Sequence, residues 1–285
     1  MANIKTLEQT LKANEFAITA EIPAPISASA SEMEEKIDLL TGHVHAINVT
    51  DNPGATAHMS SLAGCSIVRN KGIDPIFQVT CRDRNRLAIQ SDLMGASALG
   101  INNVLTLAGD PVKNGDQPDA KAVFDVNSKK ILSIMQSMND LGETMSGRQL
   151  QTKSNFFAGG AAIIHEPENN WDPVALKDKV TQGAKFIQTQ FCYDVDLLRD
   201  YMKHIVDAGL SEKLFFIIGI GPLRSDKSAK WMRDKLFGTV IPESIVQRME
   251  QAENQIQEGT AICAELINQF EEIDGVHGAH LMAPR

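Results

Sequence analysis

The stretch PIFQVTCRDRNRLAIQSDLMGASALGINNVLTL, residues 75–107, is the smallest unit of this chain that indicates the fold. It begins with the apolar run 75–81 and ends with the apolar run 103–107, and both runs have the length of a buried strand. Between them, 84–99 has apolar residues at helical spacing, and Gly100 follows where a glycine can end a helix. Two buried strands joined by a helix are typical of parallel pairing through a right-handed crossover.

The same alternation extends along the whole chain. Eight apolar runs are predicted to be strands: 16–22, 44–49, 75–81, 103–107, 155–164, 186–192, 214–220 and 275–282. Eight amphipathic stretches are predicted to be helices: 32–40, 57–70, 84–99, 128–141, 173–182, 195–208, 226–236 and 242–270. Ser31 with Glu34, and Asp172 before Pro173, are predicted to cap two of these helices.

Eight such units in 285 residues match the size of a (β/α)₈ barrel, which takes about 250 residues. An open doubly wound sheet is the alternative, and it usually has a glycine-rich turn after its first strand. Here the first strand ends at Glu21-Ile22 and is followed by Pro23-Ala24-Pro25. We therefore predict an α/β fold, a (β/α)₈ TIM barrel that forms a single domain over residues 1–285.

Composition excludes several classes of protein. The chain is 43% hydrophobic and 22% charged, which is ordinary for a folded protein, and its net charge of −9 disfavours a nucleic-acid binder. No apolar run approaches the ~20 residues of a membrane span, and the first 16 residues contain no apolar signal core. The four cysteines form no CxxC pair and are predicted to be reduced packing residues. We expect a cytoplasmic protein that binds neither nucleic acid nor membrane.

In a barrel of this kind the active site lies at the carboxyl ends of the strands. Polar residues stand at most of these ends in the sequence: Glu21, Thr50-Asp51-Asn52, Thr80 to Arg86, Gly109-Asp110, His165 and Thr189-Gln190. Glu21 follows apolar neighbours, and an unpaired carboxylate in such a setting favours a functional role. Arg82, Arg84 and Arg86 precede a helix start, where an anion can bind.

Other catalytic patterns are missing. The chain has no GxSxG, HExxH or GxxxxGK[ST] motif, and neither close pair of histidines has the spacing of a zinc protease. The sequence therefore predicts no metal site and no serine hydrolase.

The strand-end residues resemble those of the methylenetetrahydrofolate reductase family, in the same order over nearly the whole chain. The resemblance is carried by Ala20-Glu21-Ile22-Pro23, Val49-Thr50-Asp51-Asn52, Thr80-Cys81-Arg82-Asp83-Arg84-Asn85-Arg86, Ala108-Gly109-Asp110-Pro111, Phe124-Asp125, Leu176-Lys177-Asp178-Lys179-Val180 and Thr189-Gln190-Phe191. The Arg-Asp-Arg-Asn-Arg and Gly-Asp-Pro runs resemble one bacterial branch.

The resemblance implies a flavoprotein that interconverts 5,10-methylenetetrahydrofolate and 5-methyltetrahydrofolate, with NADH or NADPH as hydride donor. It assigns Glu21 as the general acid, and Asp110 as the carboxylate that stabilises positive charge on the folate. Gln190 and Met232 are implied to bind substrate, together with Asp110. The flavin, FAD as the first expectation, would contact Thr50, Thr80, Arg82, Arg84, Gly109, Asp110, His165 and Lys179. A homo-oligomer is expected, and in a host that catabolises one-carbon compounds the reaction could run toward oxidation.

Three departures from the family pattern concern the cofactor. Ala108 and Asp178 stand where the better-studied branch has basic residues, and the aromatic that covers the nicotinamide falls near Trp231-Met232. Either Arg82 or Arg84 replaces the lost phosphate contacts, or the flavin binds weakly, or the cofactor is smaller. FAD, FMN and no flavin are therefore open, in that order. The alternatives to a reductase are a pterin-dependent methyltransferase barrel and a flavin-free folate-binding barrel.

Overall fold

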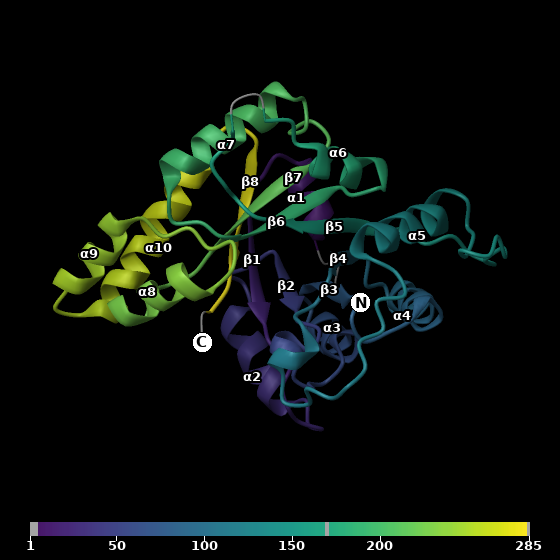
Figure 1. The fold of residues 1–285 in the computed structure, drawn as a ribbon. Coiled ribbons are helices and arrows are strands. Elements are labelled where there is room, and N and C mark those ends of the chain that lie inside the picture. The colour runs from purple at the N-terminus through teal and green to yellow at the C-terminus, as the bar shows by residue number, and fades with distance from the viewer. Residues whose placement is uncertain (1–4, 169–170, 284–285) are drawn as a thin grey trace.

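The computed structural model describes residues 5–168 and 171–283, and in them the strands form a closed parallel barrel (Figure 1). The strand order around the barrel is the order in the chain, and β1 pairs with β8 to close it. The strands are β1 (Ala17–Ile22), β2 (Ala46–Val49), β3 (Asp74–Thr80), β4 (Asn103–Leu107), β5 (Phe157–Ala162), β6 (Phe186–Phe191), β7 (Phe215–Ile220) and β8 (Val276–Leu281). The predicted (β/α)₈ barrel is confirmed.

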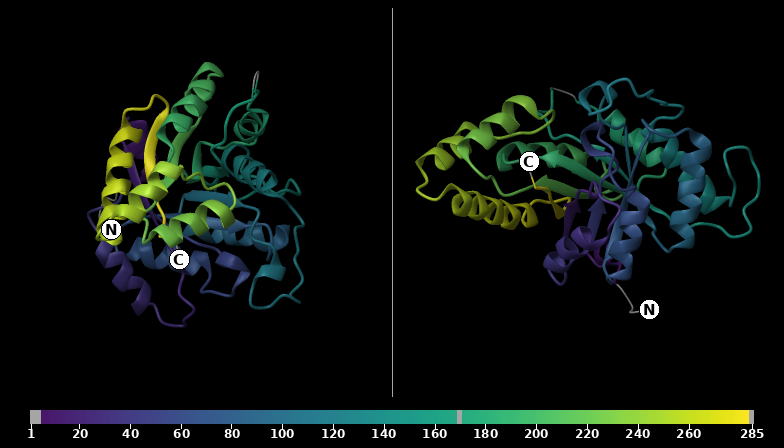
Figure 2. Two further views of the ribbon diagram at one scale, coloured as in Figure 1. Left: turned by 60° about the vertical axis from the view of Figure 1, so that its left-hand side comes forward. Right: turned by 90° about the horizontal axis from the view of Figure 1, so that it is seen from below.

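Helices surround the strands and cover their outer side with apolar residues. They are α1 (Leu7–Lys12), α2 (Ser31–Leu40), α3 (Ser61–Asn70), α4 (Arg86–Ala98), α5 (Ser128–Asp140), α6 (Val174–Thr181), α7 (Val195–Asp207), α8 (Asp226–Lys235), α9 (Glu243–Gln251) and α10 (Gln255–Glu271). Figures 1 and 2 show α8, α9 and α10 gathered on one side of the barrel. In the described part of the chain, no helix is long and apolar enough to cross a membrane.

Several local predictions need correction. The helix predicted over 242–270 is two helices, because the chain leaves helical geometry after Gln251 and the Asn254 side chain caps α10 by accepting the N–H of Gln257. Ser31 is the first residue of α2 and not its cap, and α6 follows Pro173 without a side-chain cap. The cysteines agree with prediction, since all four are free and buried.

An apolar cluster fills the amino-terminal end of the barrel. Alternate residues of a strand face the interior, and at this end the inward residues are mostly hydrophobic. Helix α1, which the sequence did not predict, lies across the opening and buries Leu7 and Leu11 completely. This apolar cluster consists of the two leucines with Ala17, Ala46, Ile76, Leu105, Phe157, Phe186 and Ile217. The buried carboxylate of Asp74 anchors the helix by accepting the Leu7 N–H at 2.7 Å.

Candidate active site

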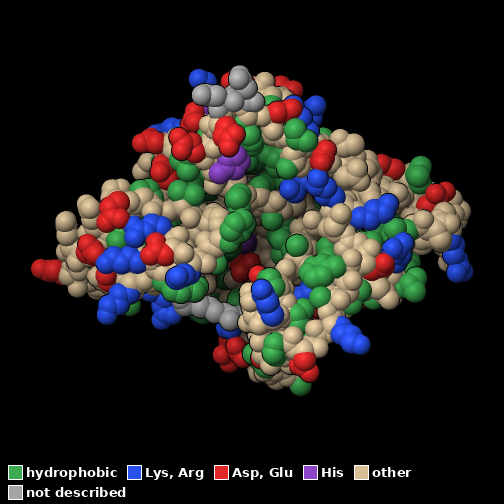
Figure 3. Space-filling view, in the orientation of Figure 1, with side chains coloured by type: hydrophobic (Ala, Val, Ile, Leu, Met, Phe, Trp, Pro, Cys, Tyr) green, Lys and Arg blue, Asp and Glu red, His purple; other side chains and the backbone are tan. Residues whose placement is uncertain are grey.

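A cavity of about 780 Å³ opens at the carboxyl ends of the strands, where such barrels hold their active sites. Figure 3 shows a hollow in this face, with acidic side chains inside and hydrophobic ones around it. The structure brings nine of the eleven predicted site residues to its wall: Glu21, Thr50, Thr80, Arg82, Gly109, Asp110, His165, Lys179 and Gln190. Arg84 and Met232 do not line it.

Glu21 projects from β1, and its side chain is 24% exposed. One carboxylate oxygen, Oε2, accepts a hydrogen bond from the amide of Gln78 at 2.9 Å and lies 3.9 Å from Nε2 of His280. The apolar surroundings expected for Glu21 are therefore wrong, because β3 and β8 place the polar side chains of Gln78 and His280 beside the carboxylate. An orienting donor on one oxygen leaves the other free to face a substrate.

Beneath Glu21 lies a buried polar layer that the sequence analysis missed. It consists of Thr19, Asn48, Gln78, Gln188 and His280, all less than 5% exposed. Strand alternation could have revealed it, since Thr19, Asn48, Gln78 and Gln188 each stand two residues before an inward residue at a strand end. Its members satisfy one another: Asn48 and Gln188 exchange amide hydrogen bonds, and Thr19 bonds His280.

Asp110 sits in the loop after β4, exposed at the cavity wall. Gly109 before it has a φ of +92°, and a side chain there would press on Thr80 and Arg82. The Asp110 carboxylate accepts the backbone N–H of Gly54 at 2.8 Å, which ties this loop to the loop after β2. The second carboxylate oxygen has no hydrogen-bond partner among the described residues.

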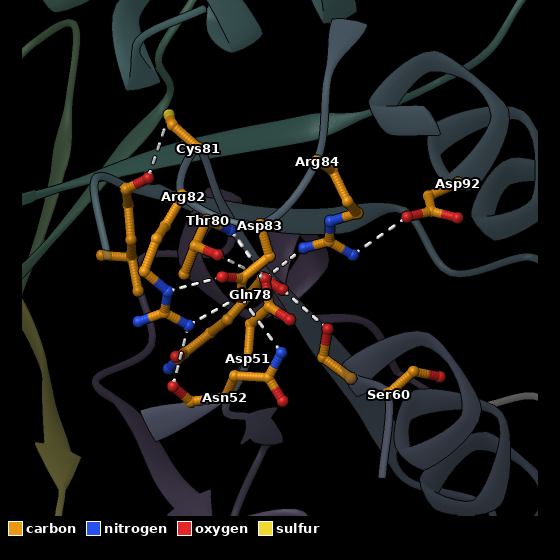
Figure 4. Close-up of polar contacts among 12 residues, drawn as sticks. Asp51, Asn52, Ser60, Gln78, Thr80, Cys81, Arg82, Asp83, Arg84 and Asp92 are labelled. Atoms are coloured by element: carbon orange, nitrogen blue, oxygen red, sulfur yellow. Dashed lines mark hydrogen bonds and ion pairs between the residues drawn. The ribbon is translucent and has the colours of Figure 1, made fainter. Parts of the chain in front are cut away.

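The guanidinium of Arg82 is buried and fully engaged by the protein. It forms a two-pronged ion pair with Asp83 and donates to the backbone carbonyl of Asn52 (Figure 4). It also donates to the backbone carbonyl of Asp110. The hydrogen bond to Asp83 raises the pKa of Arg82, so the group stays charged. Arg82 thus joins the loops after β2 and β4, and its charge is already neutralised by Asp83.

Arg84 is turned away from the cavity. Its guanidinium pairs with Asp51 and with Asp92, the latter at 2.9 Å (Figure 4). Asp51 in turn accepts hydrogen bonds from the backbone and the hydroxyl of Thr80, at 2.8 and 2.9 Å. The structure therefore lends no support to the idea that Arg82 or Arg84 replaces the missing phosphate contacts, because carboxylates already hold both.

The side chains of Thr50 and Lys179 also lie on the cavity wall without a protein partner among the described residues. The hydroxyl of Thr50 is buried without a hydrogen bond, and the ammonium of Lys179 has no ion pair among the described residues. Burial lowers the pKa of Lys179, and Lys129 lowers it further, while Asp178 opposes the shift. A desolvated cation and an unpaired hydroxyl fit an anionic ligand rich in oxygen.

Aromatic residues stand at the mouth of the cavity. His165 packs edge-on against Trp171 and Tyr201, with ring centroids 4.9 and 5.4 Å away. Phe237, in the loop after α8, lines the cavity and is 84% exposed. Met232 is completely buried in the hydrophobic core and does not line the cavity, whereas Phe237, which the sequence analysis did not select, does.

Gln190 is the next-to-last residue of β6 and is half-buried. Its side-chain oxygen accepts the N–H of Phe191 at 3.0 Å, while its amide nitrogen has no partner among the described residues. A free amide N–H at the wall can bind a carbonyl or ring nitrogen of a ligand.

Comparisons with known proteins cover nearly the whole chain. The profile of the family described as "Methylenetetrahydrofolate reductase" matches residues 6–284. Methylenetetrahydrofolate reductase 1 of Schizosaccharomyces pombe is 26% identical over 77% of this chain and 36% of its own length. Methylenetetrahydrofolate reductase (NADH) 1 of Zea mays is 24% identical over 93% of this chain and 46% of its own. The chain thus spans less than half the length of these relatives.

One solved structure has the same fold over almost its full length. It is an uncharacterized protein from Clostridium thermocellum that binds two copies of 5-methyl-5,6,7,8-tetrahydrofolic acid. Its TM-score is 0.69 at 16% identity, and the match covers 98% of this chain and 93% of that one.

Proposed function

Because this chain belongs to the methylenetetrahydrofolate reductase family, we propose that it reduces 5,10-methylenetetrahydrofolate to 5-methyltetrahydrofolate with hydride from NADH or NADPH. The observation that carries the proposal is the placement of Glu21 and Asp110 on one cavity at the carboxyl ends of the strands. The folate ligand of the Clostridium thermocellum protein, which has this fold, supports the choice of substrate. In a host that oxidises one-carbon compounds, the same site would catalyse the reverse reaction.

The residues present fit a flavin. The orphan hydroxyl of Thr50 and the unpaired ammonium of Lys179 supply polar contacts, and Gly109 lets the backbone of the loop after β4 pack closely against Thr80. These residues and His165 would hold the cofactor, with Lys179 toward its phosphate. A bound flavin would accept hydride from the nicotinamide and deliver it to the folate. FAD is the first candidate and FMN the second. On the cavity wall, Arg82 is paired with Asp83, whereas Lys179 has no ion pair among the described residues.

Glu21 would act as the proton donor. The methylene carbon bridges two folate nitrogens, and one C–N bond breaks when its nitrogen takes a proton and keeps the electron pair. The result is a cationic iminium that can accept hydride. Gln78 holds Oε2 of Glu21 at 2.9 Å, which orients the carboxyl group toward the cavity. A positioned acid of this kind typically contributes about 10²-fold or more.

Asp110 and Gln190 would bind the pterin. The Asp110 carboxylate keeps one oxygen free of protein contacts and carries negative charge that offsets the developing cation. The unpaired amide of Gln190 would donate a hydrogen bond to the ring, and the exposed ring of Phe237 offers an apolar face at the cavity mouth.

The test is to purify the protein and record its visible absorbance, then follow each half of the reaction under anaerobic conditions. We expect a bound flavin that NADH or NADPH bleaches and that 5,10-methylenetetrahydrofolate restores to the oxidised spectrum. A protein that binds folate tightly, but neither binds added FAD or FMN nor catalyses hydride transfer, would contradict the proposal. It would favour a flavin-free folate-binding barrel, and methyl transfer to a corrinoid would indicate a methyltransferase.

A further inference from the structure

The buried polar layer under Glu21 contains a chain of hydrogen bonds that leads toward the Glu21 carboxylate. Gln188 donates its amide N–H to the hydroxyl oxygen of Thr19 at 3.3 Å, and that oxygen lies 2.9 Å from Nδ1 of His280. The other end of the imidazole, Nε2, lies 3.9 Å from Oε2 of Glu21. The chain therefore runs from β6 through β1 to β8 and ends at the proposed acid.

This arrangement fits a neutral imidazole whose Nδ1 accepts a hydrogen bond from Thr19. The Thr19 oxygen accepts a hydrogen bond from Gln188, and its hydroxyl hydrogen can be donated to Nδ1 of His280. A neutral imidazole whose Nδ1 accepts a hydrogen bond carries its proton on Nε2. That N–H has no hydrogen-bond partner among the described residues. The carboxylate oxygen Oε2 of Glu21 lies 3.9 Å from Nε2.

We propose that His280 is a positioning residue for Glu21, held by Thr19 in the tautomer that directs its Nε2–H at the carboxylate. The inference rests on the proposed function, in which Glu21 gives its proton to a folate nitrogen. At that step the O–H bond of Glu21 breaks and the N–H bond of the folate forms. His280 keeps its own proton and stabilises the carboxylate that remains.

A purely structural role explains the layer poorly. The layer below it fills the barrel with apolar side chains, and buried polar groups lower stability unless each is satisfied. Thr19 and Asn48 are fully buried, and Gln188 and His280 are 2% exposed, so all four have given up water. Along the hydrogen bonds that join Gln188, Thr19 and His280, the donor without a hydrogen-bond partner among the described residues is the Nε2–H that faces Glu21.

The tautomer can be measured directly by NMR of the holoenzyme labelled with ¹⁵N-histidine, with the His280 signal identified by its loss in His280→Gln. His45 is an internal reference, because its Nδ1 accepts the backbone N–H of Ile18 and must be unprotonated. We expect His280 to show the same Nε2–H pattern as His45. A proton on Nδ1 of His280 in the wild-type protein would overturn the proposal.

Two matched variants test the link to the reaction. Thr19→Val keeps the shape and removes the hydroxyl, whereas Thr19→Ser keeps the hydroxyl. In the valine variant we expect the His280 tautomer to become mixed and folate-dependent reoxidation of the flavin to slow about tenfold, or about 1.4 kcal/mol. Reduction of the flavin by NADH should stay within twofold, and the serine variant should resemble wild type in both steps.

The outcomes separate this proposal from the proposed function. Equal loss of both half-reactions in Thr19→Val, or an unchanged tautomer, would make Thr19 and His280 structural residues. A wild-type protein with the expected tautomer but no folate turnover would reject the proposed function, and with it the role assigned to His280 in catalysis.

Discussion

The two ends of the barrel interior are built from the same inward-facing strand positions but have opposite character. At the amino-terminal end, residues such as Ala17 and Phe186 pack with Leu7 and Leu11 of α1 into a closed apolar cluster. Two residues further along the same strands, Thr19 and Gln188 are polar, and beyond them Glu21 and Gln190 reach the cavity. The amino-terminal end therefore stabilises the fold, whereas the carboxyl end contains buried polar groups that lower stability and form the site.

The largest effect is expected at the apolar end. Phe186 is completely buried, stacks on Phe157 at 5.2 Å and occupies the space over Gly159. We expect Phe186→Ala to lower the free energy of unfolding by about 3–5 kcal/mol, because it leaves a cavity that the barrel cannot close. Denaturant unfolding measures this, with the exposed Leu87→Ala as control. A loss below about 1 kcal/mol would show that this end does not carry the stability.

At the other end, Glu21→Gln should affect turnover and not stability. Glutamine keeps the shape and the contact with Gln78 but cannot donate an acidic proton. We expect folate reduction to fall about 10²-fold or more, while NADH still reduces the flavin at its normal rate. Stopped-flow measurement of each half-reaction tests this, and Glu166→Gln, outside the cavity wall, is the matched control. An equal fall in both steps would make Glu21 a structural residue.

Lys179 should make flavin affinity depend on pH. Burial lowers its pKa below the ordinary lysine value of about 10.5, so its charge is present at neutral pH and is lost as pH rises through the lowered pKa. Attraction to a flavin phosphate should weaken over the same alkaline range. We expect Lys179→Met to weaken binding about tenfold at neutral pH, since a hydrogen bond to a charged group contributes about 1.5 kcal/mol.

Lys179→Arg is the control for this prediction, because arginine stays charged throughout the range and should remove the pH dependence. Equilibrium dialysis at a series of pH values measures the flavin affinity of the wild type, Lys179→Met and Lys179→Arg. Identical pH profiles for wild type and Lys179→Arg would place the flavin phosphate elsewhere.

The smallest effect is expected at Asp110. Asparagine preserves the acceptor for the Gly54 N–H, so the loop should keep its shape. Removal of the negative charge should favour the reduced, anionic flavin and raise its midpoint potential. The expected rise is equivalent to a free energy of about 1 kcal/mol, the scale of one nearby charge in a partly solvated site. It should also slow hydride delivery to the cationic folate. Asp140→Asn, at the end of α5, should change neither quantity. If Asp110→Asn also changes neither, Asp110 is a turn residue only.

Local sequence patterns predicted the barrel because they depend on neighbours in the chain. Apolar runs of strand length alternate with amphipathic helices, and Gly100, Gly142, Gly183 and Gly209 all take the positive φ expected after a helix. The strand ends also brought most of the predicted site residues to the cavity wall, since parallel strands bring their carboxyl ends to one face. Patterns of this kind could not show that α1 closes the barrel, because its apolar face is short and its partners are distant strands.

Side-chain pairing was decided by the tertiary structure alone. The run Arg82 to Arg86 suggested free cations at a helix start, but Asp83, Asp51 and Asp92 neutralise the first two arginines. Met232 and Phe237 are five residues apart, yet one is buried in the core and the other lines the cavity.

The sequence by itself therefore determined the (β/α)₈ fold, the family resemblance and the positions of Glu21 and Asp110 at strand ends. The tertiary structure decided which charges remain unpaired, and it placed His280 of the last strand beside Glu21 of the first. The physical reason is that periodicity and capping act over a few residues, whereas hydrogen bonds and ion pairs in a closed barrel join side chains more than 200 residues apart.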